Sequence, residues 1–251
     1  MRKLVACSVF GLAAVFAGSA LAADPIQYNY PVYKDYVPPY VPDVDYGLKG
    51  SFYLRGSVGG NLGWAKEVNH PDFDPAPFPV NEFGYGYSAG VGAGYETGDG
   101  FRFDVTVDYL QNRGMAINVP NAGATWAAGD YSLNLRSTIA LANAYYDFGL
   151  GDLGLSAAGG MFGYLGVGAG VAFNDMDTSE PGGVTGPRGS NTSFAAAGMA
   201  GVGYDFGSVV ADLGYRGLYI NKIENTSAPH NYSIDHALIH EVRATLRYRF
   251  N

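Results

Sequence analysis

Cysteine, basic residues and long apolar runs are all scarce in this chain of 251 residues. The single cysteine, Cys7, excludes a disulfide framework and a thiolate zinc site. Lys and Arg number 15 against 23 Asp and Glu, and this formal charge of -8 argues against nucleic acid as a partner. Beyond the first residues, no stretch holds about 18 apolar residues without polar interruption, which excludes a bundle of transmembrane helices.

The first residues have the layout of a cleavable export signal. Arg2 and Lys3 precede an apolar run from Leu4 to Phe16, and Ala20-Leu21-Ala22 has the small-x-small pattern of a cleavage site. We therefore expect a signal peptide over residues 1–22 and a mature protein that works outside the inner membrane.

Residues 23–49 form a second zone, rich in proline and tyrosine. Five prolines alternate there with six tyrosines: Pro25, Pro31, Pro38, Pro39 and Pro42, with Tyr28, Tyr30, Tyr33, Tyr36, Tyr40 and Tyr46. So much proline excludes a helix or a central strand and favours extended chain. We expect a stiff periplasmic extension here, with a partner-docking arm as the alternative.

Glycine and aromatic residues are abundant, and from Gly50 onward they alternate with the period of two that is typical of strands. The alternation predicts eight strands, near residues 51–64, 83–96, 101–109, 131–148, 153–173, 194–206, 209–219 and 241–250. Long connections are expected over 65–82, 111–130, 174–190 and 221–234, and the others are short. In the fourth strand, Leu133 and Leu135 have the opposite parity to Tyr146 and Phe148, which predicts a β-bulge.

The residue types on the two faces decide between a soluble and a membrane sheet. Bulky apolar side chains such as Phe103 and Val105 share one face, whereas glycine and charge share the other. The interior of an eight-stranded barrel has room only for side chains, which suits small residues and ion pairs inside. We predict an all-β fold over residues 50–251, an eight-stranded antiparallel up-and-down transmembrane β-barrel with a Pro/Tyr-rich N-terminal extension. A soluble sandwich or a lipocalin-like barrel is the alternative.

Charged residues on the inward face are the candidate site. Buried charges persist only when they are paired, so we predict structural ion pairs in the lumen, with a narrow ion-selective pore lined by the same groups as the alternative. The candidates are Arg55, Glu96, Arg102, Asp104, Asp108, Arg136, Asp212, Arg216, Glu241, Arg243, Arg247 and Arg249.

Catalytic, metal and cofactor motifs are not found in the sequence. His236 and His240 are four residues apart on a strand, too far to chelate one metal ion easily, and no helix follows the Gly-x-Gly runs to bind a phosphate. We therefore predict no catalytic residue, no metal ligand and no cofactor. A haem or ligand contact in the loops and a lipid-modifying barrel enzyme are weaker alternatives.

Several segments carry a resemblance to a known family. They are Val91-Gly92-Ala93-Gly94-Tyr95, Asn143-Ala144-Tyr145-Tyr146-Asp147-Phe148, Gly201-Val202-Gly203-Tyr204-Asp205-Phe206, Asp212-Leu213-Gly214-Tyr215-Arg216 and the closing stretch from Val242 to Phe250. The chain resembles the small opacity-type outer-membrane β-barrel proteins of Gram-negative bacteria, porin-like surface antigens related to the OmpA-like barrels. The resemblance implies an outer-membrane location and an assembly signal at Phe250, read by the barrel-assembly machinery.

The expected function is a non-enzymatic role in envelope integrity, with surface interactions made by the long loops. A narrow porin-like channel for ions or small solutes is the main alternative. The expected partners are outer-membrane lipid and lipopolysaccharide, the barrel-assembly machinery at the C-terminal strand, and an extracellular ligand or host surface at the loops.

Overall fold

A computed structural model describes residues 50–70, 77–119, 128–150, 160–181, 186, 188–227 and 231–250. The expected signal peptide (1–22) and Pro/Tyr-rich extension (23–49) lie outside the described residues. No helix in the described part of the chain is long and apolar enough to cross a membrane.

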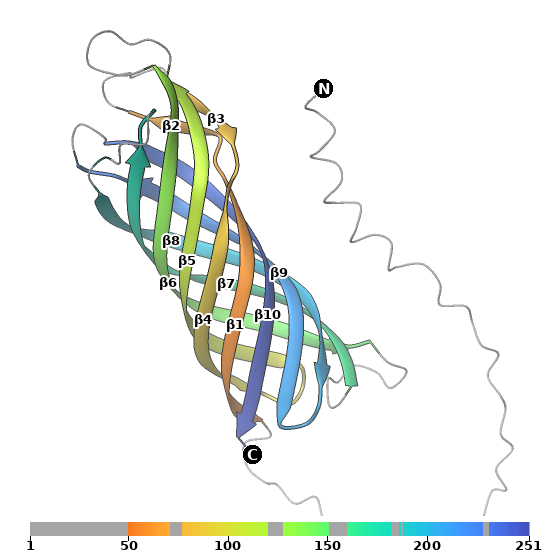
Figure 1. The fold of residues 1–251 in the computed structure, drawn as a ribbon. Coiled ribbons are helices and arrows are strands. Elements are labelled where there is room, and N and C mark those ends of the chain that lie inside the picture. Colours follow the sequence, from red (N-terminus) through yellow and green to blue (C-terminus); the bar gives the residue numbers. More distant parts are fainter. Residues whose placement is uncertain are drawn as a thin grey trace, which may run out of the picture. The chain divides into compact units, whose positions relative to one another are not determined.

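Eight long strands form a closed ring (Figure 1). They are β1 (Ser51–Trp64), β4 (Gly84–Glu96), β5 (Phe101–Val119), β6 (Gly129–Gly149), β7 (Gly160–Ser179), β8 (Gly189–Asp205), β9 (Val209–Glu224) and β10 (Ser233–Phe250). Each strand pairs antiparallel with the next strand of the ring, and β10 pairs with β1 from Phe52↔Phe250 to Trp64↔Leu238. The predicted eight-stranded up-and-down barrel is confirmed.

Two short strands extend the first hairpin of the barrel. They are β2 (Glu67–Asn69) and β3 (Phe78–Glu82), at the end of the barrel away from the C-terminus (Figure 1). Val68 of β2 pairs with Ile234 of β10, and Val80 of β3 pairs with Ile117 of β5. Past the ends of β1 and β4, these strands therefore continue the wall, where the sequence predicted only a loop.

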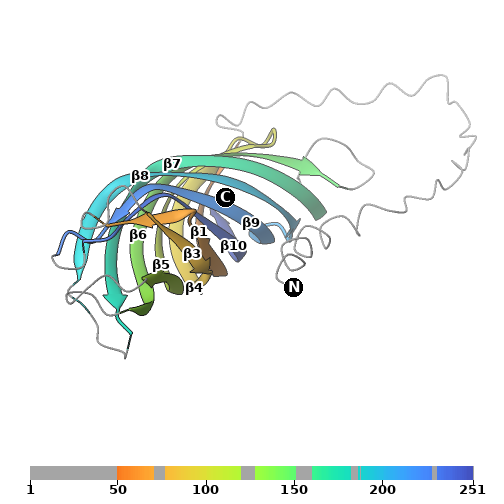
Figure 2. The same cartoon turned by 90° about the horizontal axis from the view of Figure 1, so that it is seen from above.

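At one end of the barrel two of the three connections are short; the third, residues 150–159 between β6 and β7, is longer than the turn that the sequence predicted there. Residues 97–100 join β4 to β5, residues 206–208 join β8 to β9, and the C-terminal end of β10 lies at this same end. Figure 2 shows the ring of strands from above. In outer-membrane barrels the short turns face the periplasm and the long connections face outward, so we call these the periplasmic and the outer end.

Several strands continue further toward the outer end than the sequence predicted. The expected loops 111–130, 174–190 and 221–234 each begin or end inside a strand, because β5, β6, β7, β9 and β10 continue into them. Strand β7 begins at Gly160 rather than near 153, and residues 151–159 lie outside the described residues.

The bulge predicted in the fourth strand is wrong. Strand β6 pairs with β7 without a break from Ser132 to Gly149. The irregularity lies in β5, between Asn112 and Met115, where Gly114 has a φ of 80°. The two apolar sets of β6 simply occupy opposite faces, with Leu133 and Leu135 inside the barrel and Tyr146 outside.

A belt of apolar side chains covers the outside of the barrel. Phe52, Val91 and Leu246 are exposed over 60%, 68% and 61% of their surface. Other large apolar residues on the outer face have similar exposed fractions. Aromatic residues border the belt, with Tyr95, Phe101, Tyr204 and Phe250 toward the periplasmic end and Trp64, Tyr85, Tyr87, Tyr109, Phe173 and Phe194 toward the outer end. Such aromatic borders belong to the two membrane interfaces. The chain therefore spans a membrane with the architecture of an outer-membrane barrel, and the predicted location is confirmed.

Candidate functional site

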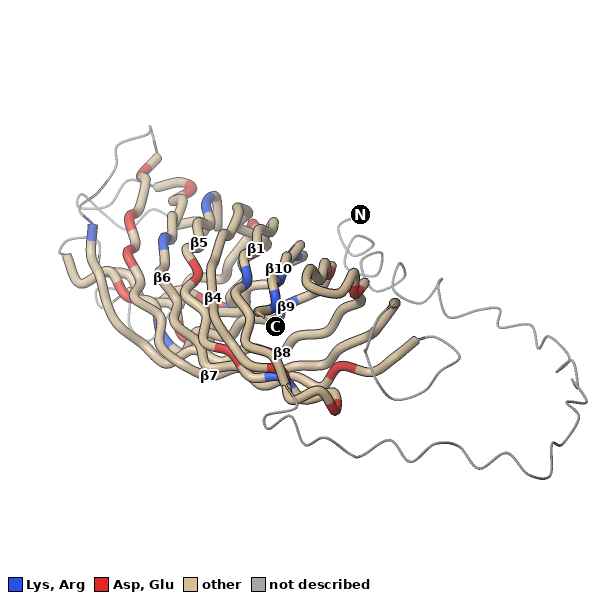
Figure 3. The backbone as a smooth tube through the Cα atoms, turned by 90° about the horizontal axis from the view of Figure 1, so that it is seen from below, with Lys and Arg blue, Asp and Glu red and all other residues tan. Residues whose placement is uncertain are grey.

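The lumen gathers most of the charged residues chosen from the sequence. Figure 3 shows acidic and basic positions interleaved on neighbouring strands. The residues that face inward are Arg55, Glu96, Arg102, Asp104, Asp108, Asp212, Arg216, Glu241, Arg243, Arg247 and Arg249. Phe250 ends β10 at the periplasmic end with its side chain on the outside of the barrel, and its role as an assembly signal stays a prediction.

Arg136 lies elsewhere, so its predicted lumen position is wrong. Because Leu133 and Leu135 fill the interior, the even-numbered residues of β6 face outward, and Arg136 lies half-buried on the outer wall. The sequence interpretation placed bulky apolar side chains such as Leu133 and Leu135 outside, which reversed the orientation of the outer half of this strand.

The layer nearest the periplasm is a cluster around Arg249. Its Nη1 lies 2.6 Å from Asp205 Oδ2, and its Nε donates to Glu96. Glu96 also accepts from Arg247 Nη1 at 3.2 Å. This cluster therefore joins β10 to β4 and β8 across the lumen.

The second layer is built on Arg102, only 2% exposed. Its guanidinium binds Asp147 through two parallel hydrogen bonds, 3.1 Å from Nε to Oδ2 and 3.0 Å from Nη2 to Oδ1. The same guanidinium lies 3.9 Å from the centre of the Tyr145 ring. Bidentate pairing and aromatic stacking are the two geometries in which arginine binds most specifically.

Asp104 is saturated with donors in the same layer. Arg55 Nη1 donates to it at 2.8 Å, the Tyr53 hydroxyl at 2.9 Å and Asn143 Nδ2 at 2.7 Å. Arg55 Nη1 also donates to the Tyr145 hydroxyl at 2.8 Å. Three strands, β1, β5 and β6, thus meet at one carboxylate.

The third layer centres on Asp108, whose exposure is 1%. Arg216 Nη1 lies 2.7 Å from its Oδ2, and Arg243 Nη2 lies 2.5 Å from its Oδ1. Arg216 also donates to Glu241, and Arg243 to the Ser57 hydroxyl. Above this layer the polar contacts become neutral, as in the 2.8 Å bond from Asn112 Nδ2 to Asn61 Oδ1.

The sequence interpretation missed two carboxylates of this network, Asp147 and Asp205. Each stands just before a turn at the periplasmic end, as Glu96 does. The recurrence of an acidic residue just before each of these turns is the sequence feature that could have identified Asp147 and Asp205.

Glycines opposite the arginines give these large side chains their room. A Cβ on Gly59 would lie 2.9 Å from Arg243 Cγ, and one on Gly94 would lie 2.6 Å from Tyr53 Cζ. Real Cβ atoms do not approach that closely, so the glycine content of the inward face follows from the size of the lumen side chains.

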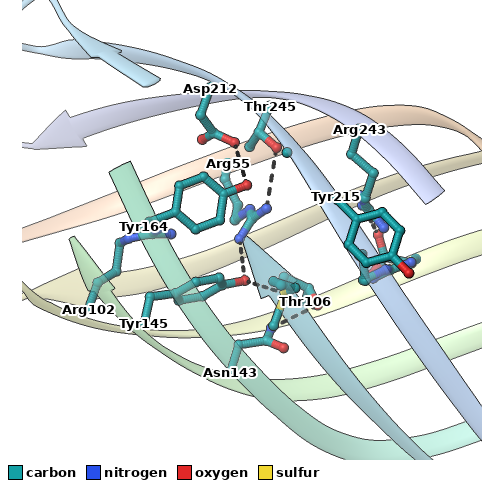
Figure 4. A pocket seen from close by; sticks show the side chains of 14 residues that line it. Arg55, Arg102, Thr106, Asn143, Tyr145, Tyr164, Asp212, Tyr215, Arg243 and Thr245 are labelled. Carbon is teal, nitrogen blue, oxygen red and sulfur yellow. Dashed lines mark hydrogen bonds and ion pairs between the residues drawn. The ribbon is translucent and has the colours of Figure 1, made fainter. Parts of the chain in front are cut away.

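The network leaves almost no free space. A cavity of about 20 Å³ lies between Arg55, Arg102, Tyr145 and Tyr164, whose hydroxyl is 3.3 Å from Asp212 Oδ1 (Figure 4). A cavity needs roughly 10–15 Å³ to hold one water molecule, so this cavity has room for a single water.

The outer half of the lumen is filled with apolar side chains. They include Leu110, Ile117, Leu133, Ile139, Met176, Leu218, Ile220, Ile223, Ile234 and Ile239, each at most 3% exposed. A cavity of about 10 Å³ is found among them. The described lumen therefore has an ionic periplasmic half and a closed apolar outer half.

Comparisons with known proteins place this fold among related chains. No family model matches the sequence. An uncharacterized protein of Brucella abortus is 29% identical over 260 residues, which cover 88% of this chain and 83% of that protein. One of Brucella suis is 28% identical with the same coverage.

Solved structures with a similar trace are outer-membrane and surface proteins. Neisserial surface protein A shares 22% identity at a TM-score of 0.47, covering 79% of this chain and 97% of that one. OprG of Pseudomonas aeruginosa shares 12% at 0.44, with coverage of 80% and 96%. The outer membrane protease OmpT of Escherichia coli shares 7% at 0.38, again with 80% and 96%. At these identities the functional conclusion has to come from the chain's own residues.

Proposed function

We propose that this outer-membrane β-barrel is a closed, non-enzymatic surface protein that reinforces the envelope and presents its outer end for interactions. The observation that carries the proposal is the filled lumen, in which six arginines pair with seven carboxylates. Buried charges with good partners hold strands in one arrangement but leave no path for a solute.

The apolar outer half supports a closed barrel over the alternative of a narrow channel. An ion that entered from outside would first cross a constriction lined by side chains such as Leu110, Ile139 and Leu218. Hydrophobic constrictions of this kind exclude water and block conduction.

The interior hydroxyls support a structural role over a catalytic one. Ser57 accepts from Arg243, and Ser137 donates to Asn174 at 2.7 Å. A nucleophilic serine needs an adjacent base to remove its proton, and in both pairs the partner is a group that holds the wall together.

The outer end supports the interaction role. There the outward-facing residues change from apolar to polar, as in Asp175, Asn221 and Arg188. Binding residues commonly lie in connections that a rigid scaffold holds in place, and the paired lumen is such a scaffold.

Conductance in planar lipid bilayers tests the closed lumen. We expect the refolded full-length protein to give no discrete openings, although unheated and heated samples migrate differently on a denaturing gel and so demonstrate a folded barrel. A porin of known conductance, reconstituted in the same bilayers, shows that the assay detects an open lumen. Discrete openings by the unmodified protein, with a cation preference that weakens in Asp108→Asn, would establish the channel instead.

A further inference from the structure

We propose that Arg113 and Arg136, on the outer wall of the barrel, bind a phosphate group of a lipid in the outer leaflet. The inference rests on the proposed function only for the orientation of the barrel, with its long connections outside. It adds a specific lipid partner to that function.

The two arginines lie at the level of a membrane interface. Both face outward on adjacent strands, with Arg113 exposed on β5 and Arg136 half-buried on β6. Gln111 is the register partner of Arg136, and Tyr85 is the register partner of Arg113. The apolar belt ends immediately below them at Tyr109, and headgroup phosphates lie beside such aromatic borders.

Neither arginine has a described carboxylate partner, unlike the other arginines of the described chain. The six lumen arginines and Arg188 each lie within 4.0 Å of a carboxylate oxygen. Asp175 is the register partner of Arg136, yet no ion pair joins the two side chains. The wall therefore presents two arginines that have no ion pair within 4.0 Å among the described residues, and their donors are available to an anionic ligand.

Gln111 orients Arg113 without neutralising its charge. With the amide turned so that its oxygen faces Arg113, this oxygen accepts from Arg113 Nε at 2.6 Å and also from Nη2. The amide nitrogen then donates to the Tyr87 hydroxyl at 3.0 Å. A guanidinium held along one edge by a neutral group keeps its other donors for a phosphate.

The neighbouring surface fits the remainder of a lipid. Tyr85 and Tyr87 are 68% and 54% exposed on β4, beside Arg113 and Gln111 of β5, and the acyl-facing belt continues below them. A phosphate at the arginines thus leaves the apolar part of the same molecule against apolar wall. This combination favours a lipid over a free anion or a nucleic acid.

Native mass spectrometry of the full-length protein in detergent tests the site, with bisphosphorylated lipid A as the probe. We expect the double variant R113Q/R136Q to bind this lipid about tenfold more weakly, since two charge-assisted contacts are lost. The matched control is R188Q/K222Q. It also removes two outer positive charges, but from side chains that are already paired with Asp177 and Glu224. Its affinity should change by less than about twofold.

Three results would overturn the proposal. They are unchanged binding by R113Q/R136Q, an equal loss in R188Q/K222Q, and equally tight binding of dephosphorylated lipid A. Displacement of the lipid by an equal concentration of inorganic phosphate would assign the site to a free anion and count against it as well. Heat-dependent gel migration verifies that each variant is folded. Failure here leaves the bilayer result unaffected, because neither arginine lines the lumen, so the two proposals fail separately.

Discussion

At the scale of single residues, Asp108 is a buried carboxylate that two arginines share. Arg216 from β9 and Arg243 from β10 both bind it, and both also lie within 4.0 Å of Glu241. Two positive and two negative charges thus share one buried site, where removal of either carboxylate leaves an excess of positive charge. Such an imbalance is far more costly inside a protein than the net worth of the intact pairs.

Asp108→Asn should therefore lower the free energy of unfolding by about 3 kcal/mol or more. Urea unfolding in lipid vesicles, followed by the loss of heat-dependent gel migration, measures the change. Asp175→Asn is the control. It removes the same charge from the exposed outer wall and should stay within about 0.5 kcal/mol of the unmodified protein. Equal stability of all three proteins would mean that the ionic layer does not hold the barrel together.

At the scale of strands, the direction in which a side chain points decides whether glycine is required. Gly214 of β9 faces inward, where an added Cβ would collide with the Tyr164 hydroxyl and lie 3.0 Å from Ala200 O. Gly198 of β8 faces outward, and nothing lies within 4 Å of the same added atom. The two glycines are on neighbouring strands but have opposite surroundings.

Gly214→Ala should lower the free energy of unfolding by about 1–3 kcal/mol, because the lumen is already full. Gly198→Ala should be neutral or stabilising by up to about 1 kcal/mol, because alanine has less freedom to lose on folding. The same urea titration compares the two variants. A larger loss at Gly198 would show that the lipid-facing wall, rather than the lumen, limits side-chain size.

The strands also show how far the sequence predicts the structure. The alternation of bulky apolar residues with glycine or charged residues predicts the eight strands. It also predicts which residues face inward wherever the inner face carries glycine or charge, as around Arg102 and Arg243. It failed toward the outer end, because there Leu133, Leu135 and Ile239 face inward while the outer wall turns polar. Apolar and polar residues still alternate there, but above the membrane the apolar residues face inward and the polar residues face outward. No local pattern marks the height at which this happens, so Arg136 was misplaced.

At the scale of the whole molecule, the barrel is closed independently of its outer extension. The direct pairings of β1 with β10 and with β4 complete the ring at membrane level, and Gly63 already pairs with Gly84. Strands β2 and β3 contribute Val68 and Phe78 to the apolar outer half of the lumen. Closure and the outer core are therefore separable.

Replacing residues 65–82 with a two-residue Asn-Gly turn should keep the heat-dependent gel shift while lowering stability by roughly 3 kcal/mol, the expected worth of two large buried side chains. The unmodified protein, heated and unheated, is the reference. A variant that migrates identically in both conditions would show that the ring depends on the extension after all.

One consequence of the ionic lumen concerns the order of biogenesis. The final strand, β10, supplies Arg243, Arg247 and Arg249, the counter-charges for acids on β4, β5 and β8. Before β10 has paired, the carboxylates of Glu96, Asp108 and Asp205 lack the arginines that this strand supplies. Hydrocarbon strongly disfavours such unpaired charges. Insertion of single hairpins into the bilayer is therefore less favourable than insertion of a barrel whose charges are all paired. The pairing of β10 with β1 and β9 therefore completes the charge balance of the lumen.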